Sequence, residues 1–283
     1  MTSQYPIKFT HQNLQNRSFR GQNLNEADFS NADIRGCDFS LALLQQANFQ
    51  NVKAGQTPQQ FIILFLVAIV FATLSLYAAN QMIFGILGRT PEDPAFNYSI
   101  ALFISLSVSG FASVMRKRLP RIGTIVCGAA SLAWLSFFYG GIISNNNPVI
   151  AAISALIGSI TGALVCFYIK KGFVDVAVGV VGTISAYGSA FLLFAVAITF
   201  LSVNHIIYGC LWGMWSVIGI ALTMASLKMT VKHIITYGTT SFCGADLANA
   251  NFTGAKLGST DFNGAVGWRK TVSKFDYSVG VAE

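Results

Sequence analysis

Residues 24–49 read LNEADFSNADIRGCDFSLALLQQANF, with a large apolar residue at every fifth position. The same spacing begins at residue 9, ends at residue 49, and returns from residue 242 to residue 262. We call these the inward positions; they are Phe9, Leu14, Phe19, Leu24, Phe29, Ile34, Phe39, Leu44, Phe49, Phe242, Leu247, Phe252, Leu257 and Phe262. Nine consecutive matches followed by five are far beyond chance, so they define two repeat runs.

A period of five fits neither regular secondary structure. On an α-helix, five residues rotate through about 500°, so successive apolar residues would lie about 140° apart. On a flat strand, an odd period places successive side chains on opposite faces. The period instead predicts a coil that turns one corner per repeat, so that every apolar residue points to a common interior.

Two other positions follow the same period. A small residue, usually Ala, lies two residues before many inward positions, and Asn or Asp often separates the two. Asn and Asp side chains hydrogen-bond to nearby turn backbone. The segments EADFSNADIRGCDFS (26–40) and GADLANANFTGAKLG (244–258) resemble the pentapeptide-repeat family and its A(D/N)LXX signature.

The resemblance implies a right-handed, four-sided β-helix with four repeats per coil, which binds other proteins. Because Phe alternates with Leu or Ile at the inward positions, two opposite walls are expected to carry stacked Phe. Gln12, Arg17 and Gln22 occupy the small-residue position of the first repeats. The first coil is therefore expected to be either distorted or a polar cap on the coil end.

Each run alone is too short for a stable core, since nine repeats make about two coils and five make about one. We therefore expect the two runs to stack into one composite β-helix. The alternative is that each run caps a separate partner, or the other copy in a dimer. Residues 269–283 have lost the repeat, so we expect them to be a tail or a cap.

The chain between the runs is apolar enough to cross a membrane about six times. Hydrophobic residues make up 53% of the sequence and charged residues 10%, whereas soluble domains carry about 25% charged residues. Six segments approach the roughly 20 apolar residues that a bilayer requires: 61–79, 98–115, 122–144, 149–169, one within 173–203, and 206–227. We expect a polytopic α-helical membrane domain (58–232) inserted into a cytoplasmic right-handed quadrilateral pentapeptide-repeat β-helix (1–57 and 233–268).

Loop charge indicates the orientation of these helices. The alternate loops carry nine basic residues against one, Arg89, and the nine are Lys53, Arg116, Lys117, Arg118, Arg121, Lys170, Lys171, Lys228 and Lys232. The positive-inside rule then places both termini in the cytoplasm. The resemblance, to a family abundant in cyanobacteria, implies a plasma or thylakoid membrane.

Small residues recur at four-residue spacing in the later apolar segments. Gly158, Gly162, Gly182, Gly209 and Gly213 are expected to let neighbouring helices approach closely. A dimer interface is the alternative use of this pattern, so a homo-oligomer is possible.

No motif in the sequence indicates catalysis, a cofactor or a metal site, so we expect a protein that is not an enzyme. The net charge of +7 resides in the membrane loops rather than in a basic patch, so no nucleic-acid partner is expected. The expected function is a membrane scaffold that contacts lipid and another protein. The alternative is a channel or transporter for an uncharged or lipid-like substrate, with the β-helix as its regulatory domain.

Overall fold

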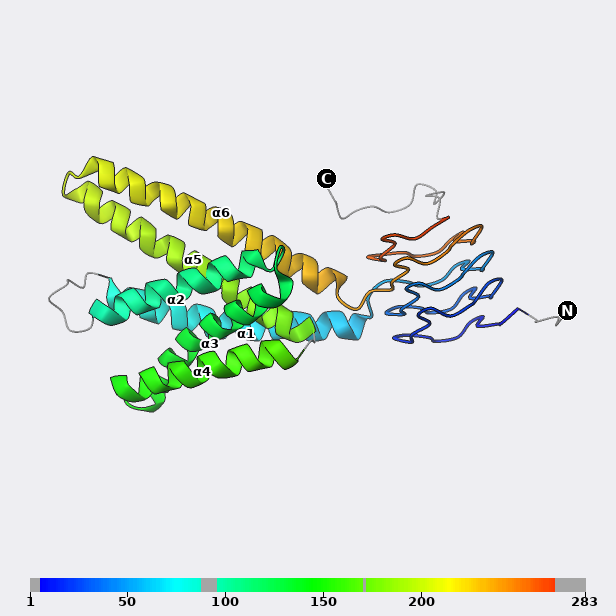
Figure 1. The fold of residues 1–283 in the computed structure, drawn as a ribbon, viewed down its shortest axis with the longest axis horizontal. Helices are drawn as coiled ribbons and strands as arrows, with labels where there is room; N and C mark the ends of the chain where they lie inside the picture. Colours follow the sequence, from blue (N-terminus) through cyan, green and yellow to red (C-terminus); the bar gives the residue numbers. More distant parts are fainter. Residues whose placement is uncertain (1–5, 88–95, 170–171, 268–283) are drawn as a thin grey trace. The chain divides into compact units, whose positions relative to one another are not determined.

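A computed structural model describes residues 6–87, 96–169 and 172–267, which divide into two compact units (Figure 1). The repeat unit comprises the chain up to Phe61 and from Ile235, and the helical unit comprises Ile62–Ile234. These divisions lie a few residues from the expected boundaries at 57 and 232. The segment with Arg89, the pair Lys170–Lys171 and the expected tail or cap at 269–283 lie outside the described residues.

The repeat unit is a coil in which backbone bridges join residues twenty positions apart. Parallel bridges join Lys8 to Asp28 and Asp28 to Asn48, and the other three walls repeat this spacing. Four five-residue repeats therefore complete one coil. The described residues contain only single-residue bridges and no continuous β-strand, so the right-handed β-helix stays a prediction.

The two runs share the third coil. Asn48 and Lys53 of the first run form two of its sides, and Ser241 and Asp246 of the second run form the other two. The residues inserted between the runs therefore leave and re-enter at adjacent corners of one coil. The bridges continue as though Ser241 belonged to the repeat that follows Lys53, so the two runs form one composite coil.

Each corner is a four-residue turn whose third residue has a positive φ. At the first corner, the Gln12 amide donates to the Phe9 carbonyl at 3.3 Å, and His11 between them has a φ of 59°. Asn and Gly tolerate this left-handed conformation best, and they are the commonest residues at these corners: His11, Asn16, Gly21, Glu26, Asn31, Gly36, Leu41, Gln46, Asn51, Gly244, Asn249, Gly254, Ser259 and Gly264. One such turn per repeat produces the period of five.

The coil interior holds two columns of Phe rings on opposite walls. One column is Phe9, Phe29, Phe49 and Phe252, with centroids 4.9 Å apart. The second is Phe19, Phe39, Phe242 and Phe262, with centroids 5.0–5.2 Å apart. Rings of different columns meet edge to face, a favourable geometry for aromatic pairs. The other two walls carry Leu14, Ile34, Ala54 and Leu257, and Leu24, Leu44 and Leu247.

The first coil has the same bridges as the coils above it, so the expected distortion is wrong. Gln12, Arg17 and Gln22 have exposed side chains at the open end of the coil. Their counterparts one coil later, Ala32, Cys37 and Ala42, are fully buried. The polar residues therefore stand where no further coil covers them, which is the arrangement of a polar cap.

The described residues of the helical unit form six helices, each long and apolar enough to cross a membrane. Their bounds are α1 Pro58–Ile86, α2 Phe96–Met115, α3 Pro120–Ile143, α4 Pro148–Tyr168, α5 Gly172–Ser202 and α6 Ile206–Thr236 (Figure 1). The fifth apolar run is one continuous helix. Helix α6 continues past its expected end at Leu227. Lys228 and Lys232 interrupt the apolar pattern there, but they do not interrupt the helix.

Thr240 closes the shared coil at the insertion. Its fully buried hydroxyl donates to the Ile34 carbonyl at 2.8 Å and accepts from the Gly55 amide at 2.9 Å. Its own amide donates to the Gly55 carbonyl at 3.1 Å. Thr240 stands where other repeats have a small apolar residue. Its hydroxyl hydrogen bonds join the second run to the first at the point where the insertion interrupts the coil.

Replacing Thr240 with Val should destabilise the third coil by about 1–3 kcal/mol, because the buried Gly55 amide loses its acceptor while the side-chain shape is kept. Hydrogen exchange measured by mass spectrometry should quicken in residues 34–55 and 241–252. The control variant Thr239→Val, which changes an exposed hydroxyl, should exchange like the wild type. Unchanged exchange in Thr240→Val would contradict this role.

Candidate functional site

The outer walls and corners of the coil are polar except in one place, while exposed Ile7 lies at the small-residue position of the first repeat, at the open end of the coil. At the position before each inward residue, every repeat from Lys8 to Val266 carries Asn, Asp, Ser or Lys, save for Leu43 and Val266. At the corners, Leu41 is the only apolar residue of the repeats. We call Leu41, Leu43 and Val266 the apolar patch.

The bridges bring the apolar patch together. Leu43 and Val266 lie on the same wall, because both bridge to Asp246 between them. Leu41 lies at the corner that leads into this wall, and its side chain rests against Gly244, where an added Cβ would approach it to 2.8 Å. The exposed fractions of Leu41, Leu43 and Val266 are 58%, 44% and 64%.

Leu41 occupies a strained backbone position. Its φ is 60°, a region that costs an L-residue about 1–2 kcal/mol unless the residue is Gly. Its exposed side chain offsets little of this cost through burial within the repeat unit. A strained and exposed leucine on otherwise polar walls makes this corner the candidate contact surface of the coil.

Asp246 lies in the same wall, and two hydrogen bonds hold its carboxylate in place. Its carboxylate accepts from the Gln45 side chain at 2.6 Å and from the Ala248 amide at 3.1 Å. The Gln45 hydrogen bond, followed by the backbone one, lowers the pKa of Asp246 below its ordinary value. Because Gln45 belongs to the first run and Asp246 to the second, this contact also joins the two runs.

Two cysteines of the coil differ in reactivity. Cys243 is exposed, and its carbonyl accepts from the Leu41 amide at 2.9 Å, so its backbone lies beside Leu41 of the apolar patch. Cys37 is buried at a small-residue position, and its thiol donates to the Leu14 carbonyl at 3.0 Å. Burial raises the pKa of Cys37 to about 12, so almost no thiolate forms at neutral pH.

The residues singled out from the sequence lie away from this surface. The inward residues line the coil interior, where Phe9, Leu257 and Phe262, near the coil ends, are partly buried and the rest are buried.

The five glycines belong to the helices. An added Cβ would collide with α3 at Gly158 and Gly162, with α2 and α3 at Gly182, and with α5 at Gly209. At Gly213 the nearest atom is 4.0 Å away, so the expected close approach there is wrong. Other glycines that make equally close contacts were not singled out: Gly110, Gly128 and Gly219.

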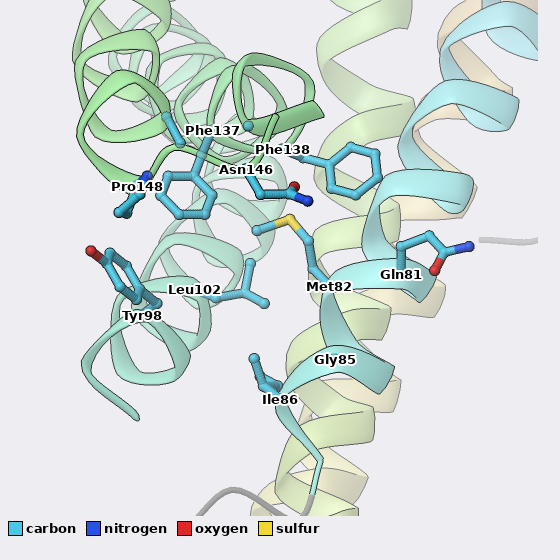
Figure 2. Close-up of a pocket in the computed structure, with 12 residues that line it drawn as sticks. Gln81, Met82, Gly85, Ile86, Tyr98, Leu102, Phe137, Phe138, Asn146 and Pro148 are labelled. Atoms are coloured by element: carbon cyan, nitrogen blue, oxygen red, sulfur yellow. The ribbon is translucent and has the colours of Figure 1, made fainter. Parts of the chain in front are cut away.

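The helical unit contains an apolar pocket of about 390 Å³ between the ends of α1, α2, α3 and α4. Figure 2 shows Met82 of α1 and Leu102 of α2 pointing into it, with Phe137 and Phe138 of α3 beside them. Asn146, in the turn before α4, adds a polar group. Within the described residues, no three His, Cys, Asp or Glu side chains are grouped to hold a metal ion.

Residues 7–40 and 240–266 match the pentapeptide-repeat family in eight copies, so the two runs are pentapeptide repeats. The match stops just before Leu41, although the bridges continue through Lys53. No curated protein and no solved structure matches the chain significantly.

The two coil thiols should react at very different rates with a maleimide at pH 7. Cys243 should be modified within minutes, whereas Cys37 should stay unmodified until the coil unfolds, since it is buried and its pKa is about 12. Peptide-resolved mass spectrometry of the labelled protein checks this difference. Similar rates at the two positions would contradict the described coil.

Acid should weaken the contact between the runs. Because the folded-state pKa of Asp246 lies below its ordinary value of 3.8, its contribution is present above that pH and is lost as pH falls through the lowered value. Exchange protection of residues 241–252, corrected for intrinsic rates, should therefore fall below about pH 4. Gln45→Leu should make this fall smaller, and Gln46→Leu, one residue further, should leave it unchanged.

Proposed function

We propose that this chain, whose two runs belong to the pentapeptide-repeat family, is a non-enzymatic integral membrane scaffold that binds another protein through its coil. The helical unit anchors the chain in the bilayer. The apolar patch carries the proposal, since it gathers exposed large apolar side chains on walls and corners of the coil that are otherwise polar.

The surfaces of the helices support membrane insertion. Large apolar side chains are exposed along whole helices, such as Ile62, Phe65 and Leu66 on α1. Lipid tails solvate such surfaces, whereas water does not. Nine basic residues against one in alternate loops support a cytoplasmic location for both runs, at a plasma or thylakoid membrane.

The coil suits a scaffold because its shape is fixed from within. We take it to be a right-handed quadrilateral β-helix, supported by the twenty-residue bridge spacing and the family match. Stacked Phe rings and backbone bridges hold the coil backbone in place, so the outer side chains project from it at regular intervals. A partner that meets the apolar patch therefore pays little ordering entropy on the coil side.

A protein partner fits this surface better than nucleic acid. The first run carries five basic and four acidic residues up to residue 57, which gives no basic footprint for phosphates. Exposed apolar side chains within a polar surround are typical of protein interfaces.

Transport of an uncharged or lipid-like substrate is the alternative, and the pocket in Figure 2 favours it. Against a continuous path, the space between α2, α3 and α5 is filled by buried Leu106, Trp134 and Val181. The Trp134 indole also donates to the Ser185 hydroxyl at 3.1 Å, which holds the Trp134 side chain in this space.

Leu41→Asn should raise the stability of the coil and at the same time remove partner binding. Asn tolerates positive φ, so the free energy of unfolding of the coil should rise by about 1 kcal/mol. The same change should abolish capture of a stoichiometric partner by tagged full-length protein from native membranes in a mild detergent, because the leucine side chain is lost.

The matched control is Gln46→Asn, at the next corner, where φ is also 60° and the side chain is exposed. It should gain similar stability and retain the partner. Capture that is equal for wild type, Leu41→Asn and the double variant Leu41→Asn/Leu43→Asn would refute the apolar patch as the interface. A partner-free oligomer that carries solute across vesicles would instead support transport.

A further inference from the structure

The turn between α2 and α3, together with the first residues of α3, concentrates positive charge at one end of the helical unit. Residues 116–121 read RKRLPR, and Lys117, Arg118 and Arg121 are exposed. Across the described parts of the chain, no acidic side chain lies within ion-pair distance of these three. Their charges are therefore available to an external anion.

Arg116 differs from its three basic neighbours because it turns into the helical unit. Its guanidinium donates to the Ser113 carbonyl at 3.1 Å and to the Asp175 carbonyl of α5 at 3.0 Å. These bonds fix the end of α2 against the start of α5. The exposed cations that follow Arg116 are thus presented from an anchored turn rather than from a free loop.

Aromatic and apolar side chains surround the exposed cations. The guanidinium carbon of Arg121 lies 4.8 Å from the centre of the Phe167 ring, near the end of α4. Tyr168, the next residue in α4, is 74% exposed, and Leu119 before α3 and Ile122 in its first turn are also exposed. Cations with aromatic and apolar neighbours at a helix end match the headgroup boundary of a bilayer.

We propose that this cationic loop, Lys117–Arg121 with Phe167, binds the headgroup phosphate of an anionic phospholipid. Arg118 and Arg121 supply fork-shaped donors suited to phosphate oxygens, and Phe167 orients one of them. Because the cations have no acidic partner among the described residues, a lipid with net negative charge is favoured over a zwitterionic lipid with the same phosphate. This inference rests on the membrane insertion proposed above.

The test uses full-length protein, stripped of lipid and offered equal amounts of phosphatidylglycerol and phosphatidylcholine, with bound lipid counted by native mass spectrometry. Wild type should retain phosphatidylglycerol in preference. Arg118→Gln/Arg121→Gln should bind it about tenfold more weakly. Lys53→Gln/Lys256→Gln, which removes the same charge from exposed positions on the coil, should bind like wild type.

A second, more conservative variant tests the same site with less risk of misfolding. Phe167→Leu keeps an apolar side chain and should weaken phosphatidylglycerol binding by about threefold, since only the orientation of Arg121 is lost. Equal binding by the double Arg variant and wild type would overturn the proposal. Displacement of phosphatidylglycerol by millimolar inorganic phosphate would overturn the lipid assignment in favour of a free-phosphate site.

Vesicle flotation separates this inference from the proposed function. Wild-type protein that fails to float with vesicles after alkaline washing would refute membrane insertion, and the lipid site with it. Protein that floats but shows no preference for phosphatidylglycerol would refute the lipid site alone.

Discussion

Completion of the third coil by two distant parts of the chain is the constraint on which the rest depends. Neither run supplies four sides for this coil, and Asp38 and Leu43 of the second coil gain their next bridge partners only when Ser241 and Asp246 return. Everything inserted between must begin and end at adjacent corners. An even number of long antiparallel helices meets that requirement, and the described part of the insertion holds six helices long and apolar enough to cross a membrane.

Within the coil, two simple effects determine the shape. A positive φ at every fifth residue turns the chain, and a large apolar side chain in each repeat fills the interior. The Phe columns stack at the spacing of the bridged backbone, so aromatic packing and backbone pairing reinforce each other. A side chain that departs from the pattern on the outside, such as Leu41, is then free to differ without disturbing the core.

Periodicity made much of this architecture predictable. The five-residue spacing indicates the coil, the Phe alternation indicates the walls, and the length of the apolar runs indicates six helices. The apolar patch is visible in the sequence only as LALL at 41–44, where Leu43 stands at the usual Asn or Asp position, and the turn that brings Leu41 beside it depends on the folded coil. Thr240, Arg116 and Gly213 were beyond prediction, since their roles depend on which distant backbone lies beside them.

Because both runs contribute to the third coil, this coil can close only after the insertion between them has been synthesised. At roughly 5–20 residues per second, ribosomes take about 10–40 s to make the insertion between the runs. Throughout that interval the second coil presents an unpaired backbone edge at Asp38 and Leu43, the kind of edge that recruits other chains. Coil closure therefore reports that the whole helical insertion has been made and that the chain has returned to the corner next to the one it left.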